Sequence, residues 1–254
     1  MANVKVRGII LRMTNFKDYD KYLSILTRDL GIISVFAKGI RRPKNRFNSS
    51  CQLFSFNDFE LFYNKGRYSL NEASNVTVFK KLHSDIYLLT AASQIAEIIL
   101  DNGQDIEASP RMYELIVRSF YELERGEKDA KTTTLAAMLK LTSYLGYKPL
   151  LDSCFECDNV FLHDEFVYFD FRSASLYCSK HVIKVRDDYN TNIRQISPAL
   201  LQALRYISDS SLEKTFSFTL NETLQDEMKA FTNLYLIERY EKSYDKISKL
   251  DMFQ

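Results

Sequence analysis

Glycine and proline, the residues that most often interrupt regular structure, are scarce in this chain of 254 residues, with only 7 and 4 copies. Long disordered linkers are typically rich in them, so no such linker is expected. No stretch approaches the roughly 18 uninterrupted apolar residues that a membrane-spanning helix needs. The opening MANVKVRGIILRM has charges among its apolar residues and no small-residue cleavage site, so we do not expect a signal peptide. These absences favour a globular protein without a membrane partner.

The recurring motifs of catalysis and nucleotide binding are also missing. The chain contains no GxxxxGK[ST] phosphate loop, no GxGxxG, no HExxH and no GxSxG. It has only 3 histidines, and acidic pairs such as Asp187-Asp188 occur at ordinary surface density. We therefore predict that the protein is not an enzyme. A metal-dependent nuclease, whose carboxylates such a search can miss, is left open as an alternative.

Positive charge is unevenly distributed along the chain. Residues 1–80 contain 14 Lys and Arg against 6 Asp and Glu, whereas residues 81–254 contain 20 against 27, and the whole chain has a formal net charge of +1. Phosphate backbones attract cations because each neutralised phosphate releases a condensed counterion. The asymmetry indicates a basic part that meets a polyanion and an acidic part that does not. The alternative is that the two parts are simply two solvated faces of one protein, which would give the same count of charges.

The first 80 residues are expected to form five short strands, at 4–11, 22–27, 32–37, 54–63 and 68–79, with a bulge near Asp58. Turns at 29–31 and 64–66 separate them. Five short strands with tight turns suggest a small closed barrel, of which the OB-fold is the commonest kind that binds single strands.

Helical signals dominate after residue 80. Apolar spacing predicts helices at 84–100 and 132–145, and a Ser-Pro start with a glycine stop predicts another from Ser109 to Gly126. A second Ser-Pro start lies at Ser197, and Asn221 is expected to cap a long helix from about Glu222 to Lys246. The predicted class is α+β, with an OB-fold domain at 1–80 and a helical domain at 81–254.

A cysteine and histidine cluster interrupts the helical part at about 151–190. Cys154-x₂-Cys157 is followed by Cys178-x₂-His181, a spacing typical of a structural zinc ribbon or finger. The strand residues of 166–171 and 176–177 predict a hairpin that returns the second pair to the first. Four ligands would close the site, so the zinc would fold the insertion without doing chemistry. Free thiols and His163 as a rival fourth ligand remain alternatives, and Cys51 is expected in the barrel core. Clustered cysteines of this kind favour a reducing, cytoplasmic location.

A basic stretch follows the third predicted strand. It carries five cations in nine residues without an acid: Lys38, Arg41, Arg42, Lys44 and Arg46. Gly39 and Pro43 predict a loop, and Arg7, Arg12 and Lys17 add charge nearby in sequence. Single strands are held by cations on phosphates and aromatic rings under bases. For the interleaved aromatic residues Tyr19, Tyr22, Phe36 and Phe47, a place in the barrel core is the favoured interpretation.

Several of these segments together resemble the RecO family of bacterial DNA repair proteins. The opening VRGIIL, the run RDLG followed by SVFAKG and Arg41-Arg42, then LGYKP, the two Cys/His pairs and the intervening FDF occur in the order of that family. The resemblance spans about residues 4–240. Some family members have a cysteine where this chain has His181, and glycine is often found in the turn where this chain has RSAS.

The resemblance implies a non-enzymatic mediator of recombinational repair. Such proteins bind single- and double-stranded DNA, anneal complementary strands and work with RecR to help RecA displace single-strand-binding protein from gaps. The family's basic barrel loop corresponds to Lys38, Arg41, Arg42, Lys44 and Arg46 here. The acidic tail of single-strand-binding protein is expected to contact the helical domain, and the location is expected to be the bacterial cytoplasm, at the nucleoid. A zinc-ribbon adaptor of the transcription or translation machinery, with a barrel that grips RNA or protein, is the alternative.

Overall fold

The computed structural model describes residues 2–47, 50–103, 108–157, 159–161, 165–186 and 192–247, with the backbone only for 184–186. His163 and Asp187-Asp188 therefore lie outside the described residues. The chain forms two compact units, residues 1–127 and 128–254, and each is described by itself. None of the helices in the described part is both long and apolar enough to cross a membrane.

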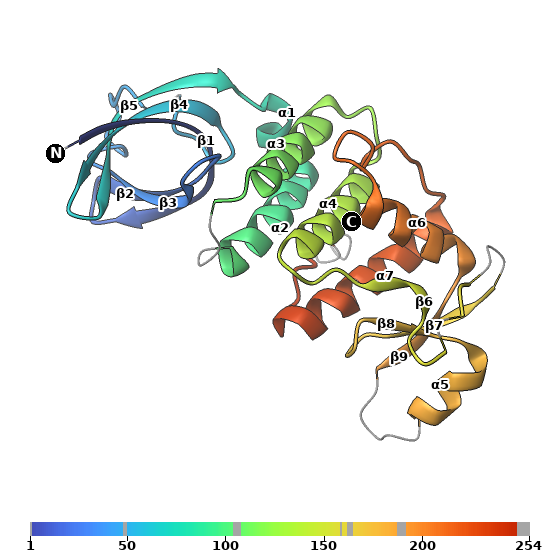
Figure 1. Ribbon diagram of the computed structural model, residues 1–254. Coiled ribbons are helices and arrows are strands. Elements are labelled where there is room, and N and C mark those ends of the chain that lie inside the picture. Colours follow the sequence, from blue (N-terminus) through green and yellow to red (C-terminus); the bar gives the residue numbers. More distant parts are fainter. Residues whose placement is uncertain are drawn as a thin grey trace. The chain divides into compact units, whose positions relative to one another are not determined.

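The first unit begins with the five expected strands, which form a closed barrel in the order β1-β2-β3-β5-β4 (Figure 1). Their bounds are β1 Ala2–Phe16, β2 Asp20–Thr27, β3 Gly31–Ala37, β4 Phe56–Asn64 and β5 Arg67–Thr77. Neighbouring strands are antiparallel except β3 and β5, which run parallel. The prediction of a mixed α and β protein with a five-stranded sheet at the amino end is confirmed.

Alternate residues of the strands fill the barrel. Ile10, Leu23, Ile25, Val35 and Leu61 are fully buried in one core cluster, which also contains Cys51 as predicted. Burial of the Cys51 thiol raises its pKa to about 11. The fourth strand starts two residues later than expected, because Phe54 adopts a left-handed backbone with φ of 62° and belongs to the preceding turn. The pairing of β4 with β5 shifts register on both sides of Asp58, between Phe56 and Asn57 and between Glu60 and Leu61.

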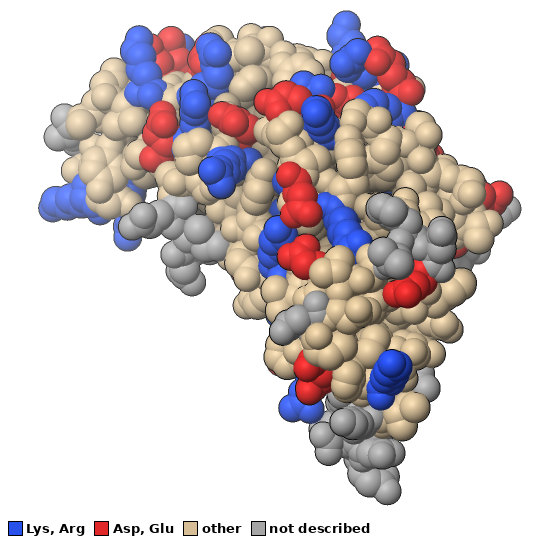
Figure 2. Space-filling model, turned by 45° about the vertical axis from the view of Figure 1, so that its right-hand side comes forward, with Lys and Arg blue, Asp and Glu red and all other residues tan. Residues whose placement is uncertain are grey.

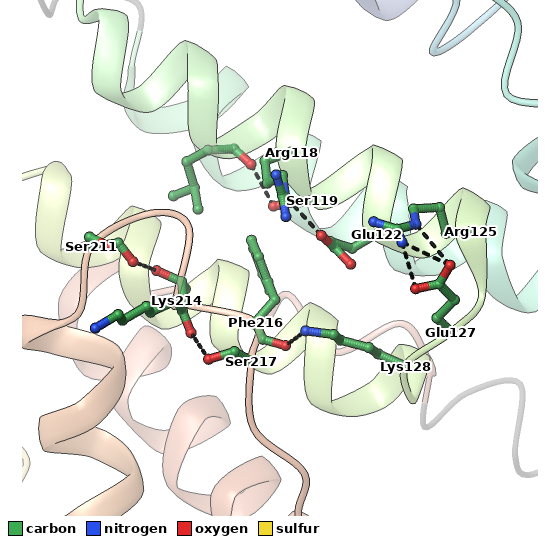
Figure 3. Close-up of polar contacts among 12 residues, drawn as sticks. Arg118, Ser119, Glu122, Arg125, Glu127, Lys128, Ser211, Lys214, Phe216 and Ser217 are labelled. Carbon is green, nitrogen blue, oxygen red and sulfur yellow. Dashed lines mark hydrogen bonds and ion pairs between the residues drawn. The ribbon is translucent and has the colours of Figure 1, made fainter.

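Three helices complete the first unit: α1 Lys80–Ser84, α2 Ile86–Asn102 and α3 Pro110–Arg125. The helix expected from residue 84 starts instead at Ile86, because the Asp85 carboxylate accepts hydrogen bonds from the backbone N–H groups of Tyr87 and Leu88. Ser109 caps α3, and Gly126 ends it with φ of 66°, as the sequence predicts. Within α3 the Arg118 guanidinium donates to the buried Glu122 carboxylate at 2.8 Å (Figure 3). Aromatic contacts then join barrel and helices, with the Phe54 and Phe120 rings 5.0 Å apart.

The second unit is built around three helices, α4 Ala130–Tyr144, α6 Pro198–Asp209 and α7 Glu222–Tyr240. Asp129, Ser197 and Asn221 cap them, the last two as expected. The final helix is shorter than predicted. Glu241 adopts a left-handed backbone with φ of 52° and its N–H group closes on the Ile237 carbonyl, so α7 ends at Tyr240 rather than at Lys246.

The segment between α4 and α6 is larger than the expected hairpin. Its strands β6 Leu150–Cys154, β7 Val167–Asp170, β8 Ser175–Tyr177 and β9 Ile193–Ile196 form a sheet in the order β6-β8-β7-β9, and α5 Ser179–Arg186 follows β8. The predicted hairpin of β7 and β8 is present. In addition, β6 pairs with β8 in parallel, and β9 pairs with β7 in antiparallel orientation. Phe169 and Phe171 of this sheet region pack against Phe231 of α7, with ring centroids 4.8 and 5.1 Å away.

The connection between α6 and α7 is held by its own backbone and by one lysine. The N–H group of Ser217 donates to the Lys214 carbonyl at 2.9 Å. The Ser217 hydroxyl donates to the same carbonyl, also at 2.9 Å, and the Lys128 ammonium group donates to the Phe216 carbonyl (Figure 3). Lys128, Thr132, Phe216 and Phe218 are among the residues that line a cavity of about 160 Å³ at this position.

Candidate nucleic-acid interface and metal centre

The basic stretch after β3 is an ordered loop of consecutive turns. Gly39 has φ of 65°, and its N–H group donates to the Asp20 carboxylate at 2.6 Å. The Asn45 amide donates to the Gly39 carbonyl at 2.9 Å and accepts the Phe47 N–H at 2.7 Å. The bond to Asp20 attaches the loop to the start of β2, and the two Asn45 bonds hold the loop together. Its cations are thus carried by a fixed backbone.

All five cations of this loop are exposed. Within the part of the chain that the structure describes, Lys38, Arg41 and Lys44 form no ion pair. The Arg46 guanidinium lies 3.4 Å from the Glu72 carboxylate and 4.7 Å from the centroid of the Phe47 ring. Arg42 lies over the ring of Tyr19, 5.5 Å from its centroid. Lys38, Arg41 and Lys44 are therefore cations that no carboxylate of the described residues pairs with.

The other two arginines expected to bind nucleic acid lie outside this loop and face carboxylates. Arg7 makes a two-pronged contact with Asp58, at 2.7 and 2.9 Å. These hydrogen bonds lower the pKa of Asp58 and raise that of Arg7. Arg12 lies 3.7 Å from Asp101 of α2. On the face shown in Figure 2, cations likewise stand among carboxylates rather than in one continuous patch. A polyanion would have to compete with Asp58 and Asp101 at these two sites.

The aromatic residues near the loop are only partly in the core. Tyr19 and Tyr22 are 51% and 40% exposed, so the core interpretation is wrong for these two. Phe36 and Phe47 are half-buried. Tyr22 lies between the inward-facing Leu23 and the preceding turn, and strand alternation turns its ring outward.

The four predicted metal ligands are brought together. Their ligand atoms all lie within 4.8 Å of one another: Cys154, Cys157, Cys178 and His181. The parallel pairing of β6 with β8 sets Cys154 opposite Leu176, which places Cys178 beside it. His181 lies in the first turn of α5, where its Nδ1 atom is 3.1 Å from the Cys178 Sγ and 3.9 Å from the Cys154 Sγ. The predicted clustering in space is confirmed.

The donor set fits a metal ion that prefers thiolate and imidazole ligands. Cys154 is buried, Cys157 is exposed, and the other two lie between these extremes. Burial raises the pKa of the Cys154 thiol, but backbone N–H groups of Cys178, Glu156 and Cys157 outweigh burial and lower it to about 6. Three sulfur atoms and one ring nitrogen so close together form a donor set that could hold a metal ion.

In a comparison with known proteins, each of the two parts of the chain matches a family description. The family description "Recombination protein O N terminal" matches residues 1–80, and "Recombination protein O C terminal" matches residues 83–247. The chain belongs to the RecO family. Within this family it is 29% identical over 247 residues to the DNA repair protein RecO of Acetivibrio thermocellus, covering 97% of this chain and 96% of that protein. It is 27% identical over 253 residues to the DNA repair proteins RecO of Bacillus cereus AH187 and Bacillus anthracis, covering 98% of each chain.

One exposed aromatic residue of this RecO family member, at the end of β1, was not predicted from the sequence. Phe16, at the end of β1, is 38% exposed and touches both Tyr22 and Phe36, with ring centroids 5.2 and 6.0 Å away. The strand expected at 4–11 stopped short of it, because polar residues interrupt the apolar alternation after Leu11. The register of β1 shifts between Ile10 and Arg12, which is a bulge, and the strand continues beyond it to Phe16. A prediction that allowed for a bulge at this position would have included Phe16 in the strand.

Proposed function

We propose that this chain is a non-enzymatic DNA-binding mediator of recombinational repair. The observation that carries the proposal is membership of the RecO family along nearly the whole chain, together with relatives named as DNA repair proteins. Residues 1–80 act as an OB-fold that binds nucleic acid, and residues 81–254 act as the helical part that meets protein partners. The five strands, their closure and the basic loop after β3 support the first assignment.

DNA is held chiefly through the loop. Lys38, Arg41 and Lys44 have no carboxylate partner among the described residues, and Arg42 and Arg46 extend the same surface. Phosphate contacts of this kind are independent of base sequence, so both single and double strands bind. Arg7 and Arg12 contribute less, because each is already opposed by a carboxylate. Complementary strands anneal when cations on one surface lower the repulsion between two backbones, and no catalytic side chain is needed.

The Cys/His cluster holds a structural zinc ion in a ribbon-like insertion. Cys154, Cys157 and Cys178 would supply thiolates and His181 its Nδ1 atom. Zinc with four protein ligands has no open position for water, so its contribution is to fold the sheet of β6 to β9 around it. The protein partners of the whole chain are RecR, the acidic tail of single-strand-binding protein and, indirectly, RecA, in the bacterial cytoplasm at the nucleoid.

The test is annealing of complementary oligonucleotides coated with single-strand-binding protein, over a salt series and with RecR present or absent. We expect the full chain to accelerate annealing at low salt and to lose this effect as salt rises. Degradation of DNA with added Mg²⁺ or Mn²⁺ would instead indicate a nuclease. Binding of RNA without any annealing of DNA would indicate an adaptor of transcription or translation.

A further inference from the structure

Three aromatic rings form a continuous patch on the outside of the barrel. Phe16, Tyr22 and Phe36, here called the outer aromatic row, come from β1, β2 and β3. Tyr22 is paired with Phe36 across the β2–β3 ladder, and Thr14, two residues before Phe16, is paired with Tyr22. The ring of Tyr22 lies 5.2 Å from that of Phe16 and 5.4 Å from that of Phe36. Residues paired across neighbouring strands face the same side of a sheet.

This patch is not part of the barrel core. The strand neighbours of the row, Leu23 and Val35, are fully buried inside the barrel, so the row faces outward. Phe16 and Tyr22 remain 38% and 40% exposed. Contiguous exposed aromatic surface is costly in water and marks binding sites in soluble proteins.

The charges beside the row indicate which kind of partner it takes. The Lys17 ammonium lies 5.5 Å from the centroid of the Phe16 ring. Next to it, a surface cavity of about 470 Å³ is lined by the three cations Lys17, Lys38 and Arg42, by Tyr19, Gly39 and Asn45, and by the two carboxylates Asp18 and Asp20. The Asp20 carboxylate is engaged by the Gly39 N–H group. Flat rings with a net positive border complement a polymer of flat bases joined by phosphates.

We propose that the outer aromatic row stacks against unpaired bases of single-stranded DNA while Lys17, Lys38 and Arg42 hold the adjoining phosphates. The inference rests on the proposed function and adds the residues that distinguish single from double strands. Cations attract both forms, but the bases of a duplex are already stacked on one another and hide their faces. Base faces are open only in a single strand, and every base has one, so the row binds without regard to sequence.

The first experiment compares the full chain with Phe16→Ala/Tyr22→Ala and with a matched control, Phe166→Ala, which removes a ring that is 59% exposed in the second unit. Fluorescence anisotropy measures the affinity of each for an oligo-dT strand and for a duplex of equal length over a salt series. The double variant should bind the single strand about tenfold more weakly or worse, with duplex affinity and salt slope unchanged. The control should match the unaltered chain.

The second experiment uses the lack of tryptophan in this chain. In Tyr22→Trp the indole would be the protein's sole tryptophan, so its emission reports on the row alone. We expect oligo-dT to quench it and duplex DNA or heparin to leave it unchanged. This variant keeps a large ring at the site and so decides the matter if the double alanine variant fails to fold.

The outcomes separate the two levels of the proposal. If the unaltered chain binds neither form of DNA in low salt, the proposed function itself fails. If it binds DNA but the double variant keeps its single-strand affinity and the indole is not quenched, only the stacking role is overturned. Equal losses for single strand and duplex would also overturn it, because the rings would then merely support the loop. A change in sedimentation of the double variant, with DNA binding intact, would assign the row to contacts between copies of the chain.

Discussion

At the scale of single residues, two backbone and side-chain details explain how the second unit holds together. Ala174 stands in the β7–β8 turn with φ of 56°, a left-handed conformation that favours glycine. The turn is fixed instead by Asp170, whose carboxylate accepts hydrogen bonds from the Arg172 N–H at 3.0 Å and the Ser173 hydroxyl at 2.8 Å. The polar turn residues thus replace the glycine that the RecO resemblance would lead one to expect there.

We predict that Ala174→Gly stabilises the protein by about 0.5–1 kcal/mol, because it removes the strain of a left-handed alanine. Thermal unfolding followed by circular dichroism should show a higher midpoint. Ala203→Gly, in the middle of α6, is the control and should lower the midpoint, since glycine is a poor helix residue. A lower midpoint for Ala174→Gly would show that the alanine methyl group contributes more by packing than its backbone costs.

A buried lysine should matter more than an exposed one. Lys140 of α4 is 3% exposed, and burial lowers its pKa. Its ammonium donates to three carbonyls around the end of α6, at 3.0 Å to Ile207 and Ser208 and 2.7 Å to Ser210.

Lys140→Met should destabilise the protein by about 1–3 kcal/mol, because buried carbonyls lose their donor. Denaturant unfolding measures the change. Lys148→Met, which removes an exposed ion pair with Asp209, is the control and should cost about 0–1 kcal/mol. Equal effects of the two variants would contradict the structural role given to Lys140.

At the scale of elements, local signals predicted most of the fold, and long-range pairing supplied the rest. Five strands, the Ser109 and Asn221 caps and the Cys/His spacing could be predicted because each depends on neighbouring residues. The strands β6 and β9 were not predicted, since they are short and owe their form to the sheet they complete. The eight-residue helix α5 was not predicted either. The outer aromatic row likewise needed the register of three strands, which no local pattern provides.

The metal cluster is expected to stabilise its whole sheet. Cys154→Ser should remove zinc measured by atomic emission and lower the free energy of unfolding by more than about 3 kcal/mol, because ligand loss releases the folding energy of the site. Cys51→Ala, a buried cysteine in the barrel, is the control and should keep its zinc. Unchanged metal content in Cys154→Ser would refute the structural zinc site.

Cations of the basic loop without an ion pair should contribute more to DNA binding than cations that already face a carboxylate. Arg41→Gln/Lys44→Gln removes two cations that have no carboxylate partner among the described residues. The slope of log affinity against log salt for a single strand should flatten by about 1.4, since each lost phosphate contact is worth about 0.7. Arg7→Gln, which removes a cation already paired with Asp58, should change the slope less. The reverse order would place the DNA on the Arg7 side of the barrel.

At the scale of the whole molecule, the net charge changes sign at about residue 80, well before the boundary between the two compact units at 127 and 128. Residues 81–127, which carry the helices of the first unit except for Lys80 at the start of α1, contain 4 Lys and Arg against 9 Asp and Glu. The excess of positive charge is therefore concentrated in the barrel segment 1–80. The rest of the first unit is acidic, and the second unit is slightly acidic, with 16 Lys and Arg against 18 Asp and Glu. Acidic surface repels DNA, so binding should be confined to the barrel and the helical parts left for protein partners.

The central claim is tested most directly by the affinity of the full chain for an unlabelled single strand. Competition experiments measure this affinity from low to moderate salt. We predict tight binding in dilute buffer and a steep loss as salt rises, with the steepness dependent on the loop cations. No binding of oligonucleotides in dilute buffer, or an affinity that salt leaves unchanged, would contradict the claim that the barrel grips a phosphate backbone.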